Sequence, residues 1–511
     1  MKIAALLLAL LPIAFVPLDD RPVTRQLPVL LGAIAGRAVS TPPRADLGNY
    51  LTPGNPEAII AWLNGPAGQH AGDFVVSTDM LAYGGLVASR IPGVTYADAY
   101  SRLRELAHLR AEHPKAWLGA FGTVMRLAPT GVPALGPAKD FFAAYPAWKY
   151  LQEYANLHDP PLPSEAARAQ ELRQLIGEPI LQAYLDTRTR NLEVDLKILQ
   201  LTSNGPIDRT VLGQDDAGPV GLHLKDVRAL KAEVAQLGIA DRVAIEPGAD
   251  ELGMAMIAQA LDRGIAWTPH VAVRYSMPDG AAFNDPLEFA PIETAIDGLI
   301  GLCGGVRDDT APDLTLYVRV PKTDPAHDAS LLASMQGDVS AGKSVALADL
   351  TFLEGSFVHQ SEFVQSMMQA GIAGKIDAYS SWNTNANTVG TALAEAIAAG
   401  VGRRSHRYNA IAHADFTFDR YMDDYLFHDY VRPDLNATLT AQGITDHTYL
   451  LPDQATPITE RNNAELWNRA VDILGQIYPG YHIADMRITL PWDRTFETEI
   501  EVRLAPGLPA R

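Results

Sequence analysis

The sequence predicts an α/β fold with a TIM-like (β/α)8 barrel core. Short hydrophobic strands alternate with helical patterns from about residue 12 to about residue 400, and most of the strands end in polar or charged residues. Such alternation is typical of βαβ units and a mostly parallel sheet. Nine or ten strands are expected before residue 400. Two doubly wound parallel-sheet halves are therefore the alternative architecture.

The expected strands are short and bounded by turn residues or helical patterns. They lie at Ile13–Leu18, Ala38–Thr41, Asp73–Thr78, Trp117–Met125, Thr210–Gly213, Arg242–Ile245, His270–Arg274, Leu314–Val320, Ser344–Ala348 and Ile376–Ala378. Helical patterns separate them, for example at Glu57–Asn64 and over residues 96–113. Because parallel strands end along one edge of a sheet, we expect the polar residues at these ends to converge there.

Three segments depart from the alternation. Residues of about 130–207 are rich in Pro, aromatic residues and helix formers, and they predict a helical insertion that covers a binding site. Residues 401–511 predict a C-terminal α+β region after the core at 12–400, because 458–476 are helical and 482–504 alternate like antiparallel strands. Residues 1–11 resemble a signal peptide, which slightly favours a secreted or periplasmic location over a cytoplasmic one. Their apolar run is too short for a stable membrane span.

Charge and cysteine content narrow the classes of partner. The chain of 511 residues has 41 basic and 60 acidic residues, a net charge of −19, which argues against nucleic acid as a partner. This charge suits a small-molecule or oligosaccharide substrate. The single cysteine, Cys303, excludes an intrachain disulfide and a cysteine-based metal site, and its neighbours predict a buried structural thiol at a helix end. The sequence does not indicate an oligomeric state.

One segment matches a phosphate-binding motif in sequence but lacks the structural context that the motif needs. Residues 337–344, GDVSAGKS, match the P-loop pattern, but a helical pattern precedes them and a strand follows. A working P-loop has the reverse order, strand then helix, so that backbone N–H groups face the phosphates. The chain has neither G-x-G-x-x-G nor G-x-S-x-G. We therefore expect no cofactor.

Paired carboxylates supply the candidate chemistry. Asp215 and Asp216 follow a short strand in VLGQDDAGPVG, at 211–221, and Glu246 ends the next strand. Two close carboxylates push their pKa values apart, which divides the roles of acid and base. We predict Asp215 and Asp216 as catalytic residues, with Glu246 as an alternative acid/base. Capping of the next helix is the structural alternative for Asp216.

Other strand ends supply candidate substrate-binding groups. Trp382 offers a stacking face, and Asn383 and Asn385 offer amides that suit sugar hydroxyls or an N-acetyl group. The candidate substrate-binding residues are Asp19, Asp20, Arg21, Asp79, Arg126, Tyr275, Trp382, Asn383 and Asn385.

Metal-dependent hydrolysis is the main rival chemistry. The histidines are scattered, so no transition-metal site is indicated, and no metal ligand is assigned. An oxygen-ligand site for Mg²⁺ or Ca²⁺ built from Asp19, Asp79, Asp215 and Asp349 stays open. A non-catalytic carbohydrate-binding protein is the second alternative.

Several long segments carry a resemblance to a known family. They are VPLDDRPVT (16–24), STDMLAYGGLVASR (77–90), TVMR (123–126), GQDDAGPVG (213–221), EPGADELG (246–253) and AYSSWNTNANTVGTALA (378–394). Over residues of about 12–500 the chain resembles the bacterial domain-of-unknown-function family numbered 4127, which implies no particular activity. Members of that family commonly begin at the first strand, so residues 1–11 strengthen the expectation of export.

A looser similarity gives the functional expectation. Substrate-assisted β-N-acetylhexosaminidases also place paired aspartates after a barrel strand, and this resemblance implies that Asp215 orients an acetamido group while Asp216 is the acid/base. The sequence therefore predicts a glycoside hydrolase acting on a sugar or amino-sugar glycoside.

Overall fold

The computed structural model describes residues 11–130, 147–216, 218–284, 291–351 and 362–507. The chain divides into two compact units, and each is described by itself. The first comprises Met1–Asp20, Val39–Met256 and Asn284–Pro291, and the second comprises Arg21–Ala38, Ile257–Phe283 and Ile292–Arg511. The expected signal segment, except for Leu11, and residues 131–146 of the expected insertion lie outside the described residues.

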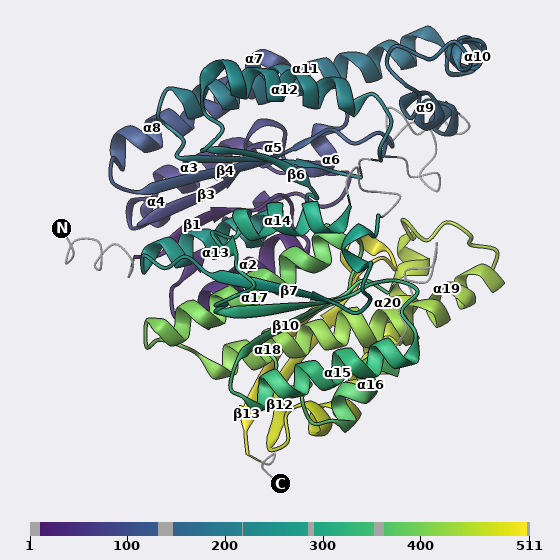
Figure 1. Ribbon diagram of the computed structural model, residues 1–511. Coiled ribbons are helices and arrows are strands. Elements are labelled where there is room, and N and C mark those ends of the chain that lie inside the picture. Colours follow the sequence, from purple (N-terminus) through teal and green to yellow (C-terminus); the bar gives the residue numbers. More distant parts are fainter. Residues whose placement is uncertain (1–10, 131–146, 217, 285–290, 352–361, 508–511) are drawn as a thin grey trace. The chain divides into compact units, whose positions relative to one another are not determined.

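The first unit contains a six-stranded parallel sheet of order β2-β1-β3-β4-β5-β6 (Figure 1). Its strands are β1 (Ile13–Val16), β2 (Val39–Ser40), β3 (Asp73–Ser77), β4 (Trp117–Val124), β5 (Arg209–Gln214) and β6 (Val243–Pro247). Its helical segments are η1 (Arg44–Asp46), α3 (Pro56–Asn64), α4 (Pro66–Gln69), α5 (Thr78–Tyr83), α6 (Leu86–Ser89), α7 (Tyr96–Leu103), α8 (Glu105–Glu112), α9 (Ala147–Ala155), α10 (Ala166–Ile176), α11 (Glu178–Ser203) and α12 (His223–Leu237). Helix α13 (Leu252–Gly264) begins in this unit and ends in the second.

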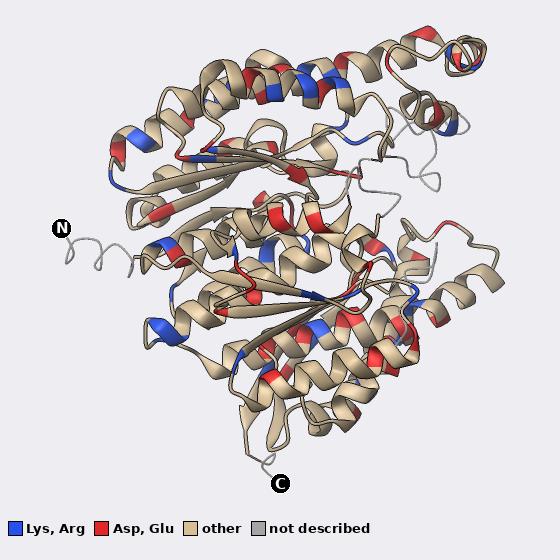
Figure 2. Cartoon of the chain, in the orientation of Figure 1, with Lys and Arg blue, Asp and Glu red and all other residues tan. Residues whose placement is uncertain are grey.

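Helices α11 and α12 cover one face of this sheet (Figure 1). Leu199 of α11 and Leu230 of α12 pack with Leu212 of β5 in one buried apolar cluster. Figure 2 shows that both helices also carry acidic and basic residues along their lengths. The described part of residues 130–207 is helical, and its last helix, α11, belongs to the core of this unit, while the role of this segment as an insertion over a binding site stays a prediction.

The second unit contains a five-stranded parallel sheet of order β11-β10-β9-β7-β8 and a two-stranded antiparallel sheet. Its strands are β7 (His270–Tyr275), β8 (Val306–Arg307), β9 (Leu314–Arg319), β10 (Ser344–Asp349), β11 (Ala378–Ser380), β12 (Tyr481–Thr489) and β13 (Glu499–Pro506). Its helical segments are α2 (Pro22–Ala35), η3 (Gly280–Ala282), α14 (Ile292–Leu302), α15 (Pro325–Ser340), α16 (Glu362–Gln369), α17 (Asn385–Arg404), α18 (Ala410–Arg420), the π-helix η4 (Tyr421–Val431), α19 (Arg432–Ala441), α20 (Pro452–Ile477) and η5 (Pro491–Asp493).

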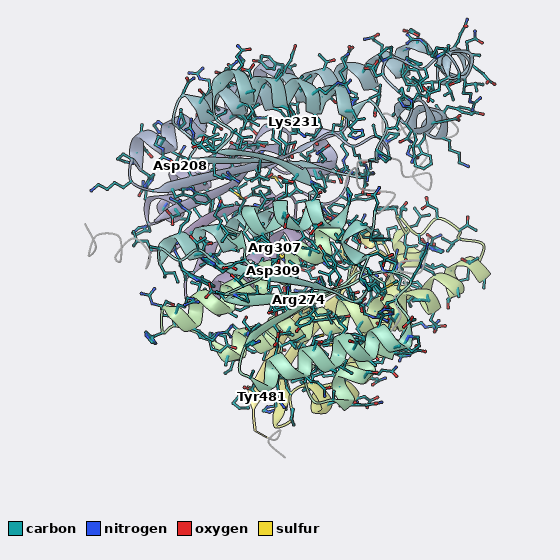
Figure 3. All side chains as sticks on the ribbon, viewed as in Figure 1. Asp208, Lys231, Arg274, Arg307, Asp309 and Tyr481 are labelled. Carbon is teal, nitrogen blue, oxygen red and sulfur yellow. The ribbon has the colours of Figure 1, made fainter. Side chains whose placement is uncertain are left out.

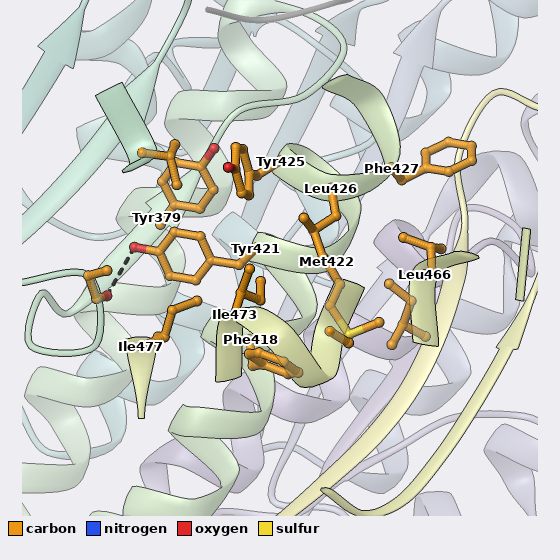
Figure 4. Packing of buried hydrophobic residues seen from close by; sticks show 14 of the residues in the cluster. Tyr379, Phe418, Tyr421, Met422, Tyr425, Leu426, Phe427, Leu466, Ile473 and Ile477 are labelled. Carbon is orange, nitrogen blue, oxygen red and sulfur yellow. Dashed lines mark hydrogen bonds between the residues drawn. The ribbon is translucent and has the colours of Figure 1, made fainter. Parts of the chain in front are cut away.

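The core of the second unit is aromatic where β11 meets η4 (Figure 4). The rings of Tyr379 and Tyr421 stack with their centroids 4.4 Å apart, and the Tyr421 hydroxyl donates to the carbonyl oxygen of Ala373. The predicted antiparallel strands near the C-terminus are confirmed as β12 and β13. The predicted order around residues 337–344, helix then strand, is also confirmed, because α15 ends within this segment at Ser340 and β10 begins at its last residue, Ser344.

The two parallel sheets share one strand order. If the strands of each sheet are numbered in chain order, the first reads 2-1-3-4-5-6 and the second reads 2-1-3-4-5. This is a common order of doubly wound sheets. The prediction of an α/β fold with parallel strands is confirmed, while a closed eight-stranded barrel is not shown among the described strands.

Candidate functional site

The C-terminal edge of the first sheet has a topological switch point. Strand β1 lies between β2 and β3, so the connections that leave β1 and β3 diverge at their C-terminal ends. Ligands of open α/β sheets bind in the crevice at this point. Asp19 and Asp20 follow β1, and Asp79 follows β3. A Cβ atom at Gly85 would lie 3.1 Å from the carbonyl oxygen of Leu18, so the loop after α5 passes close to the end of β1.

Asp79 is a buried acid on the first turn of α5. The Ser77 hydroxyl accepts a hydrogen bond from the Met80 N–H and so caps this helix after β3. The Oδ2 atom of Asp79 accepts one hydrogen bond from the Thr123 N–H at 2.8 Å and one from the Thr123 hydroxyl at 3.0 Å. Within the described residues, Oδ1 accepts none. Burial raises the pKa of Asp79 to about 7, and the charge of Asp215 adds to this increase.

Asp215 is paired with a buried arginine that the sequence reasoning missed. Arg90 directly follows α6 and contacts Oδ2 of Asp215 through Nη2. Burial raises the pKa of Asp215, and Arg90 opposes this effect. Arg90 also donates to the Thr130 hydroxyl at 3.4 Å, so a single guanidinium joins two loops of the site.

Asp216 is paired with a second arginine. Arg126, directly after the residue that follows β4, donates from Nη1 to Oδ2 of Asp216 at 2.9 Å. The backbone of Asp216 has a φ of +42°, a left-handed conformation that Asp tolerates better than most residues. Its side chain is 33% exposed, which makes it more accessible to solvent than Asp215.

Helix α11 adds charged residues beneath this edge. Arg188 donates to the carbonyl oxygens of Met125 and Arg126, at 3.0 and 2.9 Å, and thereby supports the segment that carries the Arg126 guanidinium. Asp195 is buried, and burial raises its pKa well above the usual value, with the charges of Asp79 and Asp226 adding to the shift. These residues were not predicted, although charges on the inward face of an otherwise amphipathic helix are a usable signal.

The remaining predicted residues of the first unit lie in different surroundings. Asp20 is buried and accepts hydrogen bonds from Nε and Nη2 of Arg44 at 3.4 Å, and Asp19 is also buried. Burial raises the pKa of Glu246, and the charges that oppose this shift belong to Lys231 and Arg209. Asp215 interacts instead with Arg90, Asp216 and Arg126, so Glu246 has different charged neighbours, and its role as an alternative acid/base stays a prediction.

Gln214 is an unexpected member of this edge. It ends β5, directly before Asp215, and its side chain is 3% exposed. Within the described residues, neither its amide nitrogen nor its amide oxygen has a hydrogen-bond partner. Buried amides are normally satisfied, so Gln214 is a further candidate for ligand contact.

Five of the predicted substrate-binding residues belong to the second unit. They are Arg21, Tyr275, Trp382, Asn383 and Asn385. Arg21 lies 4.7 Å from the ring centre of Trp492, and its Nη1 lies 3.8 Å from Oε2 of Glu497. Tyr275 ends β7 and lines a cavity of about 560 Å³, and burial raises its pKa to about 12. Figure 3 labels the ion-paired residues Arg274, Arg307 and Asp309 of this region.

The Trp-Asn segment follows β11. Trp382 is 1% exposed, and its indole N–H donates to the Thr391 hydroxyl at 3.1 Å, so its ring packs inside the unit. Asn383 has a φ of +53° and donates to Oδ1 of Asn387 at 3.0 Å. The fully buried amide of Asn385 has no partner within the described residues. Ligand contact by these residues stays a prediction.

The comparisons with known proteins identify a family. The family described as "Protein of unknown function (DUF4127)" matches residues 13–501. The chain belongs to this family. No curated protein and no solved structure matches this DUF4127 chain.

The described residues contain neither a cluster of metal-ligating side chains nor a helix suited to a membrane. No group of three or more His, Cys, Asp or Glu side chains is placed there to hold a metal ion, and Asp349 lies in the second unit, where it pairs with Arg319. No helix in the described ranges has the length and apolar character needed to cross a membrane.

Proposed function

We propose that this DUF4127 protein is a glycoside hydrolase that uses Asp79 as proton donor and Asp216 as the opposing carboxylate. The observation that carries the proposal is the environment of Asp79, a buried carboxyl whose pKa is raised to about 7 and whose Oδ1 accepts no hydrogen bond from any described residue. A group with a pKa near the working pH is suited to general acid catalysis.

Asp216 lies in different surroundings from this acid. Its Oδ2 is paired with Arg126 at 2.9 Å, and its side chain is exposed enough to meet a substrate. The contrast between buried Asp79, whose pKa is raised, and the more accessible Asp216, which is paired with a guanidinium, supports the division of roles that acid/base hydrolysis of a glycosidic bond requires. Asp215 would then fix Arg90 at the rim of the site rather than transfer a proton itself.

The charge balance of the site favours a neutral ligand. Arg90 and Arg126 are each matched by one aspartate, and Asp20 is matched by Arg44. A polyhydroxylated ligand suits such a set, because alternating carboxylate and guanidinium groups can accept from and donate to hydroxyls. For the architecture, we propose two doubly wound halves rather than a closed barrel, since both sheets share the 2-1-3-4-5 order.

A panel of 4-nitrophenyl glycosides, including N-acetylated sugars, tests the proposal. We expect the wild type to hydrolyse at least one member. On the unsubstituted phenyl glycoside of that sugar, whose weakly acidic leaving group needs the proton, Asp79→Asn and Asp216→Asn should each lose about 10²–10⁴-fold in kcat/KM. Asp241→Asn is the matched control, because Asp241 is exposed and its carboxylate has no hydrogen bond within the described residues, where Arg209 contacts its backbone oxygen. Full activity in both test variants would overturn the assignment.

The same panel separates the alternatives. A Mg²⁺- or Ca²⁺-dependent hydrolase loses its activity after exhaustive chelation, whereas the proposed mechanism keeps it. A carbohydrate-binding protein without activity shows sugar binding that survives Asp216→Asn and no turnover of any substrate.

A further inference from the structure

The second unit contains a cavity that the proposed function does not use. It has a volume of about 560 Å³, within the range of small-molecule sites. It lies at the N-terminal edge of the five-stranded sheet, where β9 and β10 begin, and the last turn of α17 borders it. Tyr275 and the segment after β11 lie at the opposite, C-terminal edge of the same sheet.

The rim of this cavity is cationic in a chain that is acidic overall. Four basic side chains line it, namely Lys343, Lys375, Arg403 and Arg404. The only acidic residues that line it are Asp313 and Asp377, within the described part of the chain. The net charge of the whole chain is −19. A local positive excess in such a chain favours a negatively charged ligand.

The two carboxylates are already occupied by donors. Asp377 accepts from the Ser344 hydroxyl at 2.5 Å and from both terminal nitrogens of Arg403, at 2.9 and 2.6 Å. Asp313 accepts from the Trp267 indole at 3.1 Å, from a backbone N–H, and from Nη2 of Arg404. The two carboxylates therefore hold the guanidinium groups in place. Because each carboxylate is paired with a guanidinium, it repels a bound anion less than an unpaired carboxylate would.

Several N–H groups of the basic residues at this cavity remain available to a ligand. Only Nη2 of Arg404 is engaged within the described residues, which leaves its Nε and Nη1 hydrogens available. The ammonium of Lys375 forms no ion pair there, and Lys343 contacts a single carboxylate, that of Asp338 at 2.8 Å. Both lysines are exposed and can reorient toward a ligand.

The wall of the cavity is partly apolar and is built with close contacts. Val339, Ala396 and Ile397 line it, so the ligand has a place for a hydrocarbon or ring. Arg404 lies over the Trp267 ring at 4.4 Å, and a Cβ atom at Gly400 would lie 2.7 Å from that ring. Glycine at this position of α17 therefore lets the indole approach the helix.

We propose that this cavity binds a small organic phosphate, with its phosphate group among Lys343, Lys375 and Arg404 and its organic part against the apolar wall. The GKS turn at 342–344 contributes Lys343 to this site even though the segment is not a P-loop. The size and recess of the cavity favour a small molecule over a polyanionic chain. The proposal does not depend on the hydrolase activity of the first unit.

Isothermal titration of the full-length protein with inorganic pyrophosphate and with phenyl phosphate tests the site. We expect saturable binding of one equivalent, tighter at low salt. The double variant Lys343→Gln/Lys375→Gln should weaken it by at least about tenfold. The double variant Lys115→Gln/Lys225→Gln, which removes the same charge from exposed lysines of the first unit, should bind as the wild type does.

Three results would overturn the proposal. They are no saturable binding to the wild type at millimolar ligand, equal binding by Lys343→Gln/Lys375→Gln, and an equal loss in the control variant. Trp267 provides an independent signal, since a ligand that displaces Arg404 should change tryptophan fluorescence in the wild type but not in Trp267→Phe.

Discussion

Thr123 donates two hydrogen bonds to the same oxygen of Asp79, one from its backbone N–H and one from its hydroxyl. An oxygen that accepts two donors does not also carry the proton, so the proton of neutral Asp79 resides on Oδ1. This oxygen has no partner within the described residues and is the one able to donate to a substrate.

Thr123→Val should shift the pH dependence of the proposed reaction. Both Thr123 hydrogen bonds lower the pKa of Asp79, so removal of the hydroxyl raises this pKa above about 7. A proton donor acts only while it is protonated, so the alkaline limb of kcat/KM should move up by about 0.5–1 pH unit. An unchanged limb would show that Asp79 is not the acid.

Arg90→Met should destabilise the first unit, because it leaves Asp215 buried without its ion-pair partner. Loss of one member of a buried pair costs about 3–5 kcal/mol. The double variant Arg90→Met/Asp215→Leu should recover a large part of this loss, since no charge then stays unpaired. Urea denaturation of the single and double variants measures the coupling, and strictly additive effects would contradict it.

Gly400→Ala and Gly337→Ala should have opposite effects on stability. Each glycine lies in a helix, but a Cβ atom at position 400 would collide with Trp267, whereas nothing lies within 4 Å of one at position 337. We expect Gly337→Ala to stabilise the protein by about 0.5–1 kcal/mol and Gly400→Ala to destabilise it by about 1–3 kcal/mol. Chemical denaturation checks both, and a stabilising Gly400→Ala would refute the packing.

Asp262 should make the protein less stable as the pH rises. Its Oδ2 atom is buried without a partner in the described chain, and burial raises its pKa to about 8. Between about pH 4, its unfolded pKa, and pH 8, the folded chain holds a proton that the unfolded chain has lost, so the free energy of unfolding falls with pH.

Asp262→Asn removes this titration. Relative to the wild type, it should gain roughly 2–4 kcal/mol more in the free energy of unfolding at pH 8 than at pH 5. Denaturation at the two pH values measures the difference. Asp241→Asn, at an exposed site, should show none, and a wild type that is equally stable at both values would contradict the assignment.

The sequence predicted the positions of the strands well, but it did not predict how the strands divide between two sheets. Ten of the eleven parallel strands in the described residues were expected near their observed positions, whereas β8 was missed because a two-residue edge strand, Val306–Arg307, leaves no periodic pattern. Hydrophobic alternation marks a strand but not its neighbours, so it could not distinguish one barrel from two sheets. The pairing of β1 with β3 became visible only in the sheet order.

The candidate site was predicted in part. Asp79, Arg126, Asp215 and Asp216 were expected at strand ends and are linked there by contacts or charge interactions. Arg90 and Asp195 were missed, because they come from a loop and from a helix of the insertion, where spacing along the chain says nothing about their partners. Trp382 shows the converse, since its sequence context suits ligand stacking but its indole is satisfied internally by Thr391.

The role of Asp79 as proton donor makes the effect of Asp79→Asn depend on the leaving group. With the sugar identified by the panel, kcat/KM is measured for aryl glycosides whose leaving groups range from strongly acidic to weakly acidic phenols. We expect a loss of about 10²–10⁴-fold for the poorest leaving group, which needs the proton, and a loss of less than about tenfold for the best one, which does not. An equal loss across the series, or no loss at all, would contradict Asp79 as the proton donor.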